Sequence, residues 1–122
     1  NIGLKTIPEG VSVFEITGPI FFGVATKFSD AVLRADKTKK VLVLRMRSVP
    51  AIDATGIHAF ETILESLDKK GIKLVVSHLN EQPLKILKKS GIYKRIGAEN
   101  FCPHIDIALK RAEELVKTAE NV

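Results

Sequence analysis

The stretch VLVLRMRSVPAIDATGI, residues 41–57, decides how this chain folds. It opens with a nearly continuous aliphatic run, which is typical of a parallel strand covered on both faces. Asp53 then occupies a favourable N-cap position for a helix that begins near Ala54. The stretch therefore predicts a buried central strand, residues 41–46, that leads through a short loop into a helix.

Side chains alternate between the two faces of a strand, so the two arginines of this stretch share a face. They lie at the carboxyl end of the strand, where α/β sheets place their binding crevices. The prediction assigns Leu42, Leu44 and Met46 to one face, and Val41, Val43, Arg45 and Arg47 to the other.

Outward from this stretch, hydrophobic periodicity alternates between strand and helix along the whole chain. Such alternation predicts an α/β fold with a mostly parallel sheet and about four helices. A turn at Pro8-Glu9-Gly10 adds an N-terminal antiparallel hairpin at one edge. The apolar segment Gly18–Gly23 precedes the first helix, and Pro103 is expected at the first helical position of the last one. The expected strands are 2–7, 11–16, 41–46, 72–77 and 100–102, and the expected helices are 24–37, 54–70, 80–90 and 103–117.

Composition limits the class of protein. With 122 residues, of which 45% are hydrophobic and 27% charged, residues 1–122 are expected to form one domain without a metal or disulfide staple. No signal peptide or membrane span is visible, and the missing initiator Met indicates a fragment of a longer protein. The net charge of +5 is spread along the chain, and there is no Trp, which argues against nucleic-acid binding. Cys102 has no partner, which favours a reducing compartment and a buried, inert thiol.

The sequence offers little for catalysis. His58, His78 and His104 are far apart and none stands beside a second metal ligand at a recognisable spacing. No nucleophile elbow, Walker-type loop or dinucleotide-binding glycine pattern is present. We therefore expect no metal, no cofactor and no enzymatic activity.

The remaining candidate is the start of the helix that follows Asp53, where unpaired N–H groups and the helix dipole favour an anion. Two interpretations are open. Asp53 caps the helix and nothing more, or Thr55 is a phosphoacceptor on a switch surface, with Arg47 offsetting repulsion between the phosphate and Asp53. The candidate face comprises Asp53, Ala54, Thr55, Gly56, Arg45, Arg47 and His58.

Taken in order, these pieces resemble the STAS domain, a family named for sulfate transporters and anti-sigma-factor antagonists. The resemblance rests on the hairpin start, the block at 41–56, the helix end LKKSGI and the closing ALKRAEEL, from about Val11 to Leu115. GPIFFG before the first helix and RMRSVPAIDATG make the chain most similar to the carboxy-terminal domain of a bacterial SulP-type anion transporter.

The resemblance implies a non-catalytic regulatory domain on the cytoplasmic side of the bacterial inner membrane. Its partners would be the transmembrane domain of the same polypeptide and a cytosolic protein or kinase, with a second copy of the chain as a further candidate. The alternative is a freestanding anti-sigma-factor antagonist, because in such proteins the position of Thr55 is phosphorylated by a partner kinase. A weaker alternative is a small anion or nucleotide bound with Arg45 and Arg47.

Overall fold

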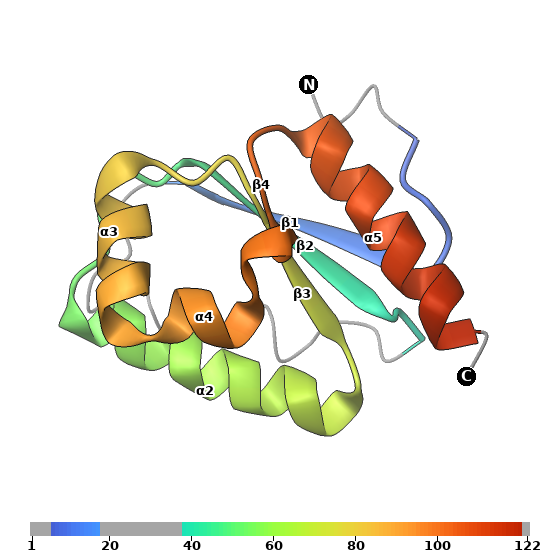
Figure 1. Ribbon diagram of the computed structural model, residues 1–122, viewed down its shortest axis with the longest axis horizontal. Helices are drawn as coiled ribbons and strands as arrows, with labels where there is room; N and C mark the ends of the chain where they lie inside the picture. The colour runs from blue at the N-terminus through green and yellow to red at the C-terminus, as the bar shows by residue number, and fades with distance from the viewer. Residues whose placement is uncertain (1–5, 18–37, 121–122) are drawn as a thin grey trace.

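The computed structural model describes residues 6–17 and 38–120, and they form a sheet flanked by helices (Figure 1). Four strands lie in the order β1-β2-β3-β4, and every neighbouring pair is parallel. This confirms the α/β class. The strands are β1 (Val11–Thr17), β2 (Val41–Ser48), β3 (Lys73–Ser77) and β4 (Phe101–Cys102).

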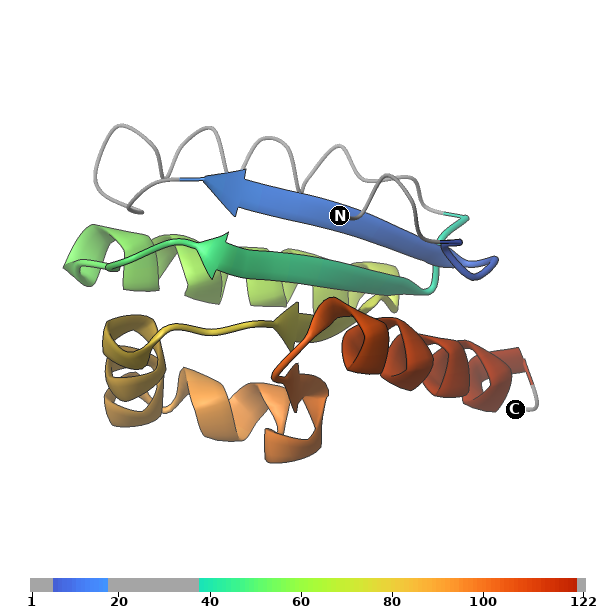
Figure 2. The same ribbon diagram turned by 90° about the horizontal axis from the view of Figure 1, so that it is seen from above.

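The helices cover both faces of this sheet. Helices α2, α3 and α4 lie on one face and α5 lies on the other, as Figures 1 and 2 show. A 3-10 turn, η2 (Ala98–Asn100), connects α4 to β4. The helices are α2 (Ala54–Lys70), α3 (Glu81–Ser90), α4 (Ile92–Ile96) and α5 (Ile105–Glu120).

β2 separates two hydrophobic cores, as its alternating pattern predicts. Leu42, Leu44 and Met46 belong to the core beneath α2, α3 and α4, whereas Val41 and Val43 belong to the core beneath α5. All five are buried. Apolar side chains on both faces of one strand therefore hold the two helical layers to the same sheet.

Helix α2 has a capping residue at each end: Asp53, as predicted, and Gly71, directly after the helix expected at 54–70. The Asp53 side chain caps its start, and Gly71 ends it in the left-handed region with φ of 71°. A residue with a Cβ is strained in that region, which is why glycine ends the helix cleanly. Lys69 and Lys70 complement the negative end of the helix dipole.

Four expectations differ from the structure or fall outside it. Pro103 was expected to open the last helix at its first position, but α5 begins at Ile105, and the carbonyl of His104 accepts the hydrogen bond from the Ala108 N–H. Pro103 therefore precedes the helix. Helix α4 was not expected, because the sequence predicts a helix at 80–90 and no further helix before 103. The helix expected at 24–37 lies outside the described residues. So does most of the first hairpin strand, and Thr6 and Ile7 at its end are not in a strand.

Candidate functional site

The start of α2 is capped by Asp53. Its Oδ1 accepts a hydrogen bond from the Gly56 N–H at 2.9 Å, and its own carbonyl accepts the Ile57 N–H at 3.0 Å. Asp53 has extended backbone angles, as an N-cap residue should. One carboxylate oxygen is thus committed to the helix, in agreement with the capping interpretation.

The first turn of α2 is open to solvent among the described residues. Ala54, Thr55 and His58 are exposed, whereas Gly56 is buried. The Thr55 hydroxyl therefore stands at the positive end of a 17-residue helix dipole, in reach of another protein. This geometry leaves both interpretations of the motif open, since a cap and an accessible hydroxyl coexist.

The loop that leads into α2 is held in place by Asn80, which sequence reasoning took only as the residue that opens α3. Its Nδ2 lies 2.8 Å from the Val49 carbonyl oxygen, 2.9 Å from that of Arg47 and 3.4 Å from that of Met46. Although Asn80 stands at the N-cap position of α3, its side chain makes no cap hydrogen bond there. It fastens the end of β2 instead.

Gln82 fastens the same loop closer to α2. Its Oε1 accepts a hydrogen bond from the Ile52 N–H at 2.9 Å, and its Nε2 donates to the Ile52 carbonyl at 3.1 Å. The side-chain amide thus satisfies both backbone groups of the residue that precedes Asp53. The position of the α2 start is therefore set by α3 as well as by β2.

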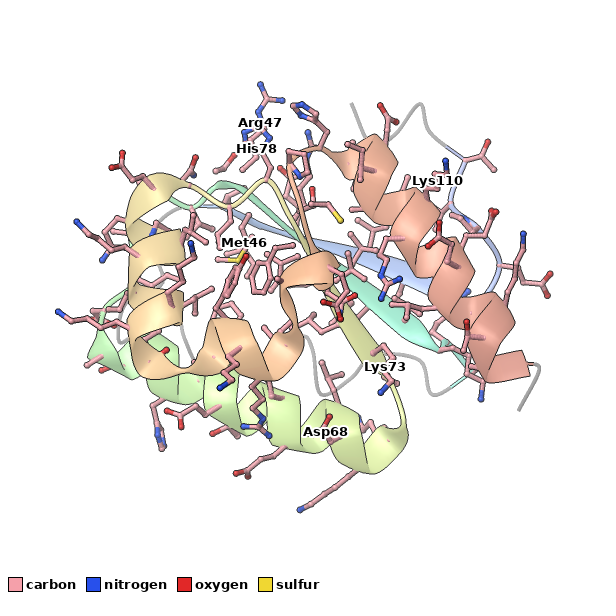
Figure 3. The ribbon with its side chains drawn as sticks, in the orientation of Figure 1. Met46, Arg47, Asp68, Lys73, His78 and Lys110 are labelled. Carbon is pink, nitrogen blue, oxygen red and sulfur yellow. The ribbon has the colours of Figure 1, made fainter. Side chains whose placement is uncertain are left out.

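The two arginines do not join this face. Arg45 is buried on the α5 face of the sheet, where its Nη1 lies 3.5 Å from Glu15 Oε1. Arg47 is exposed at the carboxyl end of β2, where it is labelled in Figure 3. By alternation both project from the face opposite to α2. The structure therefore gives neither arginine the expected place beside Thr55.

Among the described residues, a lysine of α3 lies beside the first turn of α2. A groove of about 270 Å³ runs between the two helices and is lined by Ala54, Ile57, Ile86, Lys89 and Ser90. Lys85 and Lys88 extend the positive charge along α3, where they line a second hollow together with Lys89. The sequence places these lysines within the helix expected at 80–90, but contact between two helices leaves no local signal.

The structure brings two of the three histidines together. The rings of His78 and His104 have centroids 6.0 Å apart, whereas His58 lies on α2. Within residues 6–17 and 38–120, no group of three His, Cys, Asp or Glu side chains could hold a metal ion. Cys102 is buried, as predicted, and burial raises the pKa of its thiol while the charge of Arg111 opposes the shift.

Across the described part of the chain, no helix is both long enough and apolar enough to cross a bilayer. The STAS domain family model matches residues 4–108. The chain therefore belongs to the STAS domain family, as the motifs at 41–56 and the parallel sheet indicate.

Within this family, the relatives are transporters of the sulfate class. YvdB of Bacillus subtilis, whose name assigns it to the sulfate transporters, is 31% identical over 84% of this chain and 19% of its own length. Sulfate transporter 3.2 of Arabidopsis thaliana is 27% identical over 88% of this chain, again 19% of that protein. The chain thus spans about a fifth of the length of these relatives.

Comparison with solved structures leads to the same family. A sulfate transporter family protein from Wolinella succinogenes has 40% identity and a TM-score of 0.89, with 96% of each chain covered. The SulP transporter STAS domain from Vibrio cholerae has 32% identity and a TM-score of 0.76, covering 96% of this chain and 89% of that one. An anti-sigma factor antagonist from Mycobacterium paratuberculosis, at 22% identity and a TM-score of 0.71 over 86% and 87% of the two chains, shares the fold alone. The resemblance to the STAS family, and within it to the STAS domains of SulP-type transporters, is therefore confirmed.

Proposed function

We propose that this chain is a non-catalytic regulatory and interaction domain, joined to the transmembrane part of a SulP-family transporter for sulfate or a related anion. It would lie on the cytoplasmic side of a bacterial inner membrane. The relatives support this, because the chain matches only a fifth of their length. The observation that carries the regulatory role is the exposed first turn of α2, held by hydrogen bonds from a neighbouring helix.

The proposed contact surface consists of Ala54, Thr55 and His58 of α2 with Ile86 and Lys89 of α3. It combines an apolar groove, a hydroxyl and a cation, which suits a protein partner better than a small polar molecule. A phosphate on Thr55 would gain from the helix dipole, and Lys89 would take the charge-balancing role first given to Arg47. Modification would then change the sign of charge at this surface without disturbing the cap.

The second candidate function is a freestanding anti-sigma-factor antagonist switched at Thr55. The exposed residue Thr55, two positions after the capping aspartate, favours it, because that is the position where the resemblance implies phosphorylation. A small anion or nucleotide bound with Arg45 and Arg47 has less support, since Arg45 is buried beside Glu15.

The test uses the complete natural polypeptide that contains this chain, reconstituted in membrane vesicles. Radiolabelled sulfate uptake is compared among wild type, Thr55→Glu and Lys89→Gln. The matched control is Thr62→Glu, which places the same charge on an exposed position two turns further along α2. The proposal expects altered uptake in the first two variants and wild-type uptake in the control.

Unchanged uptake in Thr55→Glu and Lys89→Gln would overturn the regulatory role of this surface. The alternative function is tested by the coding sequence and by a kinase assay. A start codon immediately before Asn1, with phosphate incorporated at Thr55 by a kinase encoded nearby, would establish the freestanding switch instead.

A further inference from the structure

The sheet ends in a strand that is too short to cover its neighbour. β4 has two residues, and these pair only with Val76 and Ser77 of β3. The first part of β3, residues 73–75, thus has no strand on its outer side within the described part of the chain. In Figure 1 this part of β3 lies between α5 on one side and α2 with α4 on the other. A sheet edge of this kind normally needs to be covered.

The backbone N–H and carbonyl of one residue on this uncovered edge point outward. The Lys73 N–H donates to the Lys40 carbonyl at 2.9 Å, which directs that peptide group toward the β2 side of the sheet. Residues of a parallel strand alternate in the direction of their hydrogen bonds, so the N–H and carbonyl of Leu74 point away from β2. At this position no strand of the described residues pairs with them.

A cleft of about 290 Å³ opens at this edge and its floor is apolar. Leu64 of α2 and Leu74 of β3 are buried, and Ile96 of α4 is half-buried against them. The volume lies at the lower end of the range for small-molecule sites. We name this feature the edge cleft. An apolar floor beside a strand edge that no other strand covers suits a ligand with a short apolar body and a polar end.

Three cations from three different elements line the rim: Lys73 of β3, Arg95 of α4 and Arg111 of α5. Arg111 is positioned, because its Nε donates to Asn100 Oδ1 at 2.9 Å while Asn100 Nδ2 donates to the Ile96 carbonyl at 2.8 Å. Of its two terminal guanidinium nitrogens, Nη1 lies 3.6 Å from a carboxylate oxygen of Glu114.

The other two cations are only weakly engaged. Arg95 pairs with Asp68 at 3.3 Å, but both side chains are exposed to solvent, so the pair contributes little. Lys73 forms no ion pair with another described residue, and Figure 3 shows it at the amino end of β3. Asp68 and Glu99 also line the cleft, so its lining holds two carboxylates against three cations, and Glu114, which pairs with Arg111, is not part of that lining.

We propose that the edge cleft binds a small organic carboxylate, with its anionic end among Lys73, Arg95 and Arg111 and its apolar part on Leu74 and Ile96. A carboxylate accepts charge-assisted hydrogen bonds from guanidinium and ammonium groups. The cleft involves none of the residues at the α2 start. The proposal therefore stands independently of the regulatory function assigned above.

The test is a titration of the 15N-labelled 122-residue chain, followed by the shifts of backbone and side-chain amide resonances. Hexanoate supplies charge and an apolar body, hexan-1-ol supplies the body alone, and sulfate supplies charge alone. We expect hexanoate to bind with a dissociation constant on the order of 1 mM. It should shift the Leu74 backbone amide and the Asn100 side-chain amide, and the other two ligands should bind at least about tenfold more weakly.

The variants Lys73→Gln and Arg95→Gln change exposed side chains, so both should fold. Each is expected to weaken hexanoate binding about fivefold. The matched control is Lys94→Gln, which removes the same charge from an exposed position of α4 that does not line the cleft. Hexanoate that shifts neither Leu74 nor Asn100 would overturn the proposal. So would equal binding by wild type and the Lys73→Gln/Arg95→Gln double variant, or sulfate binding as tightly as hexanoate.

Discussion

The side-chain amide of Gln82 exchanges two hydrogen bonds with the backbone of Ile52, thirty positions earlier in the chain, at 2.9 and 3.1 Å. Ile52 is buried, so both of its backbone groups need partners. Through this pair the first turn of α3 sets the position of the residue immediately before the α2 cap. The exposed face around Thr55 is therefore a rigidly placed surface.

Gln82→Ala should lower the free energy of unfolding by about 1 to 3 kcal/mol, because the substitution leaves two partly buried backbone groups without partners. Urea unfolding measures the loss, and hydrogen exchange at the Ile52 amide should accelerate in the variant. Lys85→Ala, an exposed change one turn further along α3, serves as the control and should be close to neutral. Equal stability of the two variants would contradict the role given to Gln82.

At Asn80, helix capping can be distinguished from attachment of β2, because the residue occupies the N-cap position of α3 but its side chain makes no cap hydrogen bond. Asn80→Ser keeps a good N-cap residue, but its short side chain cannot reach the carbonyls of Arg47 and Val49. We expect Asn80→Ser and Asn80→Ala to be destabilised alike, by about 1 to 2 kcal/mol. Chemical denaturation of both variants decides this. Full rescue by serine would show that capping, and not attachment of β2, is the function of the residue.

The capping and surface roles of the Asp53–Gly56 motif can be separated by stability. Asp53→Ala removes the acceptor of the Gly56 N–H and should lower the free energy of unfolding by about 1 kcal/mol, whereas Asp53→Asn should retain most of it. Thr55→Ala should stay within about 0.5 kcal/mol of wild type, because the residue is exposed. Thermal or urea unfolding of the three variants tests this. A large loss in Thr55→Ala would indicate a structural role.

The buried thiol of Cys102 predicts a loss of stability at alkaline pH. Burial raises the pKa of the thiol above its ordinary value of 9.0, with Arg111 opposing part of the shift. As the pH rises, the unfolded chain therefore loses this proton before the folded chain does. The free energy contributed by the neutral thiol is complete below pH 9.0 and declines as the pH rises from there through the folded pKa.

The measurement is urea unfolding of wild type and Cys102→Ala between neutral and alkaline pH. The other titrating groups are common to both chains, so their effects cancel in the difference. The stability of wild type should fall more steeply than that of the variant in the alkaline range. Parallel curves would contradict a raised pKa for the thiol.

The fold was largely predictable because its signals are local. The aliphatic run at 41–46, the aspartate before α2 and the glycine after it each act within a few residues, and the structure places β2 and α2 accordingly. Helix α4 escaped prediction because a left-handed Gly91 ends α3 and starts α4 as well. Pro103 was misplaced by two residues, since a proline before a helix and one at its first position look alike in sequence.

The site was less predictable because its supports are distant in sequence. Asn80 and Gln82 form hydrogen bonds with backbone groups about thirty positions away, and the sequence near either residue does not predict these bonds. The error about Arg45 has a different origin. Alternation correctly separated it from Met46, but α2 covers the Met46 face, so the charge lies across the sheet with Glu15.

The attachment of the β2–α2 loop to Asn80 and Gln82 has a mechanical consequence. Because α3 holds the loop by its polar side chains, a molecule that displaces α3 would carry the neighbouring hydroxyl with it. Conversely, a phosphate on that hydroxyl would act on α3 through the charge of Lys89. The α3 surface and the first turn of α2, which are separate in sequence, would then be coupled. Binding at either would alter the affinity of the other by the same factor.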